Sequence, residues 1–188
     1  MEPFQPLTCR RGVITTGDTT DDPTGAPETA ADARNARRLA LEHVYAAEHA
    51  SLVRTASLIS GSQATGEDLV QEAFAKLYPR IDHITNPAAW LRTVVVNGAR
   101  NDIRRTIVRR RFLAEHAPRG NAISEPESRS ALIESLRRLP GRQRAVVVLR
   151  FYEDRSEQDI ADVLGVRLGT VKSSLHRALA TLRQEMEQ

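Results

Sequence analysis

With 188 residues, the chain is long enough for one domain of ordinary size or two small ones, and too short for a large multidomain enzyme. Its 40% apolar and 27% charged residues are ordinary for a globular chain, whereas 4% aromatic residues are too few for an all-β sandwich or barrel. The longest apolar run, Ala145 to Leu149, is far shorter than the roughly 20 residues of a membrane span, and no basic-then-apolar leader opens the chain. We therefore expect a helical, cytoplasmic protein without membrane insertion.

The residues that usually carry metal or catalytic chemistry form no recognisable pattern. Cys9 is the single cysteine and can neither form an intrachain disulfide nor hold a structural zinc by itself. None of the five histidines has a metal-helix spacing with a neighbour, and no phosphate loop or nucleophile elbow occurs. We expect no catalytic residue, no metal and no cofactor.

The net charge of +3 is unevenly distributed along the chain. Acidic groups outnumber basic ones over the first 35 residues. The densest basic stretch runs from Trp90 to Arg111 and holds seven arginines and one acid, Asp102. The basic excess is therefore concentrated in one segment.

The beginning of the chain is predicted to be a tail followed by a long helix. Residues 1–34 are rich in Thr, Pro, Asp, Gly and Ala and lack apolar periodicity, which predicts a disordered acidic segment. From Asn35, apolar residues recur every three to four positions until Gly61, which predicts one long amphipathic helix.

A second helix is predicted to begin with a capping-box-like pattern at Thr65 and Asp68 and to end at Pro79. Its polar side opposes the apolar Phe74 and Leu77 and carries Asp68, Gln71, Glu72 and Lys76. Such a side can face solvent or dock onto a partner, and the pattern alone favours solvent.

A third helix is predicted to open at Asn86 and Pro87, with a break near Gly98. One side of it carries Trp90, Asn97, Asn101 and Arg104 at near multiples of a helical turn. An aromatic ring beside cations can stack on unpaired bases while holding phosphate. Trp90 can equally well anchor the core beneath a solvated basic face, and the sequence leaves both interpretations open.

Residues 114–129 are small, polar and proline-punctuated, which predicts a linker between two helical halves. Pro140 then ends a short amphipathic helix. The run AVVVLRFY at 145–152 contains three adjacent β-branched residues, but its unalternating pattern and its helical surroundings predict a buried helix.

Residues 156–183 fit a helix-turn-helix motif. Ser156 can cap the first helix, Ala161 is small where the two helices cross, and Gly165 supplies the tight turn. The second helix presents a polar side where a recognition helix meets base edges and phosphates: Lys172, Ser173, His176 and Arg177. The alternative is an ordinary helical hairpin with a solvated basic face.

Four segments together resemble a known family. They are DLVQEAFAKLY at 68–78, AWLRTVVVNGARNDIRR at 89–105, LPGRQRAVVVLRFYEDRS at 139–156, and the recognition helix GTVKSSLHRALATLR. In this order and at this spacing they are similar to bacterial sigma factors of the extracytoplasmic-function type. The resemblance implies an all-α protein of two small domains, a promoter-melting domain at 35–113 and a helix-turn-helix domain at 130–188, joined by a flexible linker at 114–129.

The resemblance also implies partners and site residues. The partners would be promoter DNA and core RNA polymerase, bound through the clamp of its beta-prime subunit and its beta flap, and sigma factors of this type are often held by an anti-sigma factor. The minus-10 element would be met by Trp90, Asn97, Asn101, Arg104 and Arg105, the minus-35 element by Thr170, Lys172, Ser173, His176 and Arg177, and the polymerase by Asp68, Gln71 and Glu72. Ser174 departs from the family, which often has a basic residue at this position, and this leaves the phosphate contact there open.

Two other classes of protein compete with this interpretation. A dimeric helix-turn-helix repressor or activator, with a sensor domain in its first half, would bind duplex DNA without polymerase. The basic third helix, suited to single strands, argues against that class. An enzyme is disfavoured because no catalytic motif occurs.

Overall fold

A computed structural model describes residues 30–116 and 131–186, and no strand occurs in these two ranges. The predicted all-α fold class is confirmed. No helix within them combines the length and apolar character needed to cross a membrane. The α-helices are α1 (Ala30–Ser60), α2 (Gln63–Leu77), α3 (Pro87–His116), α4 (Ala131–Arg138), α5 (Gly141–Val147), α6 (Glu157–Leu164) and α7 (Leu168–Met186); a 3-10 helix, η1 (Tyr78–His83), follows α2, and a π-helix, η2 (Val148–Tyr152), follows α5.

The N-terminal half, α1 to α3, packs around its own apolar cluster. Leu52 and Ala56 of α1 meet Val70 and Phe74 of α2, and α3 adds Leu91. The 3-10 helix continues from α2 with Pro79 in its first turn, where a missing backbone N–H costs no hydrogen bond. These contacts make α1, α2 and α3 a bundle whose outer sides remain available for partners.

The structure corrects three local predictions in this half. Helix α1 begins at Ala30, five residues before the predicted start at Asn35. Ser62, and not Thr65, caps α2, because its hydroxyl accepts the backbone N–H of Thr65 at 3.3 Å. Helix α3 runs unbroken through Gly98, where a Cβ would lie 2.9 Å from Leu69 Cδ2, so the glycine permits close helix packing.

Two predicted segments lie largely outside the described residues. The tail at 1–34 is described only over its last five residues, which belong to α1. The linker at 114–129 is described only at 114–116, where α3 continues to His116.

The C-terminal half, α4 to α7, contains the predicted helix-turn-helix. Ser156 forms a full capping box with Asp159 at the start of α6, and Gly165 ends that helix in the left-handed region at φ 61°. Ile160 and Ala161 of α6 and Val171 of α7 are buried. The run 145–152 is helical, as predicted, and passes from α5 into the π-helix. The prediction of a capped helix, a glycine turn and a second helix is therefore confirmed.

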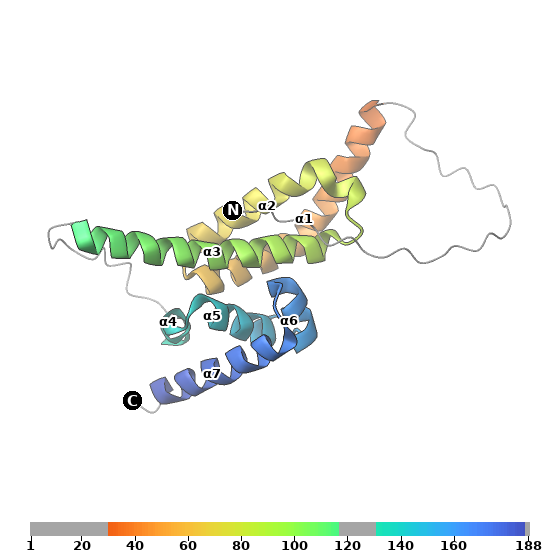
Figure 1. Cartoon of the computed structure of the whole chain (residues 1–188). Helices are drawn as coiled ribbons and strands as arrows, with labels where there is room; N and C mark the ends of the chain where they lie inside the picture. Colours follow the sequence, from red (N-terminus) through yellow and green to blue (C-terminus); the bar gives the residue numbers. More distant parts are fainter. Residues whose placement is uncertain (1–29, 117–130, 187–188) are drawn as a thin grey trace.

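The two halves pack against each other. Figure 1 shows α1 crossing behind α3, and both helices meet the group α4 to α7. Ile59 of α1 and Val96 and Ala99 of α3 are fully buried in the same apolar cluster as Leu149 and Ile160 of the C-terminal half. The side of α3 that meets the C-terminal half is thus an interface within the chain.

Candidate nucleic-acid interface

Three of the polar residues predicted for the minus-10 element, Asn97, Asn101 and Arg104, lie along the side of α3 that faces the C-terminal half. Asn97 Nδ2 donates to the backbone carbonyl of Val163 at 3.1 Å, and Asn97 Oδ1 accepts from Arg100 Nη1 at 2.9 Å. Asn101 and Arg104 are exposed and line the cleft between α3 and the C-terminal half. The structure therefore brings the amides and arginines of this strip together.

Trp90 and Arg105 stand apart from that group. Trp90 is half-buried and packs against the apolar cluster of the N-terminal half, so it contributes to the core. Arg105 is exposed, and its charge helps to lower the pKa of Glu72 on α2. Replacing Trp90 would therefore disturb packing as well as any contact with a base.

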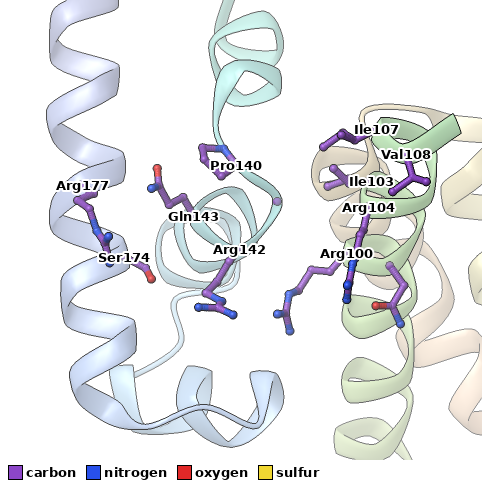
Figure 2. Close-up of a pocket in the computed structure, with 12 residues that line it drawn as sticks. Arg100, Ile103, Arg104, Ile107, Val108, Pro140, Arg142, Gln143, Ser174 and Arg177 are labelled. Atoms are coloured by element: carbon purple, nitrogen blue, oxygen red, sulfur yellow. The ribbon is translucent and has the colours of Figure 1, made fainter. Parts of the chain in front are cut away.

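The cleft between α3 and the C-terminal half has a volume of about 650 Å³ and is strongly basic. Figure 2 shows Arg100 and Arg104 on α3 and Arg142 on the facing helix α5, with Arg177 farther away on α7. None of its lining residues, all within the described part of the chain, is acidic. Burial lowers the pKa of Arg100, and the nearby charge of Arg142 lowers it further. The cleft is an environment that an anion would stabilise.

The recognition helix α7 presents the predicted polar side. Lys172, Ser173, His176 and Arg177 are exposed, and Thr170 is half-buried. Arg177 Nε donates to the carbonyl of Ser173 at 3.1 Å, and Lys172 Nζ lies 3.9 Å from a carboxylate oxygen of Glu157. These contacts are long, and both cationic groups remain exposed to solvent.

Ser174 does not belong to this exposed side. Its residue exposure is 3%, and it lines the cleft between α3 and the C-terminal half. The departure from the family at position 174 therefore falls on a residue of this cleft, and its effect on phosphate contact stays a prediction.

The predicted polymerase-binding residues Asp68, Gln71 and Glu72 are exposed on α2. Lys76 Nζ lies 2.7 Å from Glu72 Oε1, and this hydrogen bond and charge hold the pKa of Glu72 below its usual value. Exposed side chains on this side of α2 can contact either a protein partner or solvent.

Buried polar residues join the two halves, and no sequence pattern predicted them. Glu153 binds Thr55 and Arg92 of the N-terminal half. Arg144, with 5% exposure, donates to the carbonyl of Ile59 at 2.8 Å. These partners are distant along the chain, so no periodic pattern could have revealed them.

Comparison with known proteins agrees with this architecture. Two family models match the chain: sigma-70 region 2 over residues 44–110, and sigma-70 region 4 over residues 129–182. The RNA polymerase sigma-E factor of Streptomyces coelicolor is 36% identical over 146 residues, covering 72% of this chain and 80% of that protein. The ECF RNA polymerase sigma factor SigM of Mycobacterium tuberculosis is 32% identical over 149 residues, covering 77% of this chain and 76% of that protein.

Two solved structures share the fold. CnrH, in complex with the cytosolic domain of CnrY, gives a TM-score of 0.60 at 23% identity, covering 84% of this chain and 94% of that one. The sigma factor RpoE, in complex with the anti-sigma factor NepR from Bartonella quintana, gives a TM-score of 0.57 at 24% identity, covering 83% of this chain and 97% of that one.

The fold and the two matched regions define a two-part helical transcription factor. The chain belongs to the extracytoplasmic-function class of the sigma-70 family of RNA polymerase sigma factors, and it is a promoter-specific transcription initiation factor.

Proposed function

We propose that three separate surfaces divide the work of initiation. In this division α2 binds core polymerase through Asp68, Gln71 and Glu72, the strip on α3 opens the minus-10 element, and α7 recognises the minus-35 element. The polymerase performs the chemistry, and the proposal assigns no catalytic group, metal or cofactor to this chain.

The observation that carries the proposal is the composition of the α3 strip. Asn97 and Asn101 provide amide donors and acceptors for the edge of an unpaired base, and Arg104 provides charge for phosphate. Arg105, exposed on the side of α3 toward Glu72, adds a second charge beside the strip. Trp90 is half-buried at one end of the strip, and its ring offers an aromatic face on which an unpaired base can stack. The pairing edges of bases become available to these amides only when the bases are unpaired, because in a duplex those edges are occupied.

The assignment of the minus-35 element rests on the geometry of α7. Lys172, Ser173, His176 and Arg177 lie exposed in its N-terminal part, directly after the helix-turn-helix turn at Gly165. A recognition helix contacts base edges with this part, and Thr170 stands beside it. We infer that these five residues meet the minus-35 duplex.

The proposal also names the protein partners. The polar side of α2 would bind the clamp of the beta-prime subunit, and the C-terminal half would bind the beta flap, in the bacterial cytoplasm. The structural relatives CnrH and RpoE are held by the cytosolic domain of CnrY and by the anti-sigma factor NepR. We infer that an anti-sigma factor regulates this chain as well.

Run-off transcription tests the proposal directly. Purified core polymerase and the full chain are combined with a promoter library that varies the minus-10 and minus-35 elements independently. We expect transcripts only when the chain is present, with sequence preferences at both elements. Arg177→Ala should change the minus-35 preference, whereas Arg183→Ala, an exposed arginine nearer the other end of α7, should not. Transcription without the chain, or binding of duplex promoter by the chain alone, would contradict the proposal.

A further inference from the structure

The basic cleft holds arginines that lack the acidic partners found elsewhere in the molecule. Arg100 and Arg104 of α3 and Arg142 of α5 line it, and Figure 2 shows Arg100 and Arg142 extending toward each other. Within residues 30–116 and 131–186, none of these three arginines forms an ion pair with a carboxylate. Arg92, by contrast, lies 2.6 Å from Glu153. The cleft therefore concentrates positive charge that the described chain does not balance.

Arg100 has hydrogen-bond donors to spare. Its Nη1 donates to Asn97 Oδ1 at 2.9 Å and lies 3.5 Å from the carbonyl of Leu164, whereas its Nε and Nη2 have no partner among the described residues. The charge of Arg142 adds to the effect of burial in lowering the pKa of Arg100. An anion between these two guanidiniums would accept hydrogen bonds from both and relieve their repulsion, and partial burial strengthens that attraction.

The other end of the cleft is apolar. Its lining there includes Ile103, Ile107 and Val108 of α3 and Pro140. Ile107 is 46% exposed and Val108 is 61% exposed, so both can still be covered. Ile107 stands two helical turns beyond Arg100, about 10 Å along the helix, and Figure 2 shows the two at opposite ends of the cleft. A ligand that fits both ends must carry negative charge on one side and an apolar face on the other.

The size and chemistry of the cleft narrow the class of ligand. A volume of about 650 Å³ is typical of a site for a small molecule. The planar fork of arginine matches phosphate oxygens, and three arginines call for more than one phosphate charge. A nucleoside polyphosphate supplies both a chain of phosphates and a flat base. None of the described lining residues is a carboxylate that could hold magnesium, so the metal-free anion is the form that fits.

We propose that this cleft binds a nucleoside polyphosphate, with its phosphates on Arg100, Arg104 and Arg142 and its base against Ile107 and Val108. The ligand would contact both halves of the chain. This site goes beyond the surfaces proposed for polymerase and promoter. It shares Arg104 with the α3 strip, but its test uses neither DNA nor polymerase and is therefore independent of that proposal.

Isothermal titration calorimetry of the full chain measures binding directly. The probes are ATP and GTP without divalent cations, with tripolyphosphate and adenosine as partial ligands. We expect one saturable site per chain for a purine triphosphate, weaker binding of both partial ligands, and weaker binding of the triphosphate in excess magnesium. No saturable binding of ATP or GTP would overturn the inference. Tripolyphosphate binding as tightly as both would overturn the role of the apolar end, and adenosine binding as tightly would overturn that of the arginines.

The phosphate end is tested with Arg142→Ala. Its matched control is Arg183→Ala, which removes the same charge from an exposed position of α7 outside the cleft. Loss of a hydrogen bond between charged groups should weaken binding of the triphosphate about tenfold in Arg142→Ala, and the control should match the parent. Circular dichroism checks that both variants keep the helical content of the parent. Equal weakening in both would indicate general attraction to a basic protein and would overturn the site.

The apolar end is tested with Val108→Ser, and Leu39→Ser is the control because Leu39 is 45% exposed on α1 and lies outside the cleft. Val108→Ser should weaken binding of the triphosphate at least about threefold while leaving that of tripolyphosphate unchanged. The control should change neither. Unchanged binding of the triphosphate in Val108→Ser, or an equal loss for tripolyphosphate, would overturn the placement of the base.

Discussion

Gly66 is the position where the packing of α1 against α2 can be tested most sharply. A Cβ at this position would collide with Ser57 Oγ and would lie 2.9 Å from the Ser57 backbone nitrogen and 3.0 Å from the Val53 carbonyl oxygen. The Ser57 hydroxyl donates to that same carbonyl at 2.7 Å, so it cannot move without losing a hydrogen bond. Two of the three contacts are backbone atoms, and relief therefore requires the helices to separate.

The expected magnitude follows from two opposing effects. Overpacking a tight site costs about 1–3 kcal/mol, while replacing a helical glycine by alanine returns up to about 1 kcal/mol. We expect Gly66→Ala to lower the free energy of unfolding by about 1–2 kcal/mol. The matched control is Gly169→Ala in α7, where a Cβ meets no described atom within 4 Å, and it should raise the free energy of unfolding by about 0.4–1 kcal/mol.

Urea unfolding followed by circular dichroism measures both variants against the parent. At an unchanged dependence on denaturant, the midpoint should fall for Gly66→Ala and rise slightly for Gly169→Ala. A Gly66→Ala protein as stable as the parent would refute the close crossing of α1 and α2.

Three further predictions concern the exposed surfaces. Alanine at both Asp68 and Gln71 should weaken binding to core polymerase in a titration without changing helical content, since exposed polar substitutions rarely cost much stability; unchanged affinity would assign this side to solvent. Alanine at Lys172 or Arg177 should weaken minus-35 binding, with a base-edge contact contributing about 1–3 kcal/mol of discrimination; equal losses on every sequence in a binding assay would indicate phosphate contacts instead. The hydroxyl and backbone N–H of the capping Ser156 lower the pKa of Asp159. The ionised carboxylate therefore stabilises the folded protein above the ordinary carboxyl pKa of about 4. This stabilisation is lost as pH falls through the lower pKa of the folded state. Urea unfolding of the parent and Asp159→Asn should therefore differ near neutral pH and converge in acid, and a constant difference would contradict this.

The helix-turn-helix could be predicted from sequence because its determinants are local. The capping serine, the left-handed Gly165 and the apolar spacing of α7 all lie within one continuous segment, and each acts on its neighbours. The same locality made the β-branched run at 145–152 recognisable as helix, since its flanks were helical.

Sequence-based prediction of helix boundaries and burial failed in two situations. Either two neighbouring residues fitted the same role equally well, or contacts with another helix determined the outcome. Ser62 and Thr65 are both capable helix caps, and only the course of the chain after Gly61 selects the first. A glycine inside a helix suggests a break, yet Gly98 is retained in α3 because Leu69 packs against it. Ser174 looked like a surface position, but the rotation of α7 buries it at the cleft.

The contact between the halves was beyond sequence reasoning for a different physical reason. Glu153 meets Arg92 and Thr55 at separations of 61 and 98 residues. Such pairs create no periodicity, and one acid among many polar neighbours gives no sign that it will be buried. The position of Asn97, Asn101 and Arg104 on one helix could therefore be predicted, but the contact of Asn97 with α6 could not.

Promoter opening by the α3 strip is tested most directly with Asn97→Ala, because Trp90 packs against the apolar cluster of the N-terminal half and its replacement would also disturb that core. Permanganate footprinting measures unpaired thymines in the minus-10 element for parent and variant at saturating core polymerase. Duplex and pre-melted templates are compared in parallel. We predict that the variant forms the closed promoter complex normally, shows reduced thymine reactivity on duplex DNA, and recovers most of it on the pre-melted template. Thymine reactivity equal to that of the parent on duplex DNA would contradict the assignment of promoter melting to α3.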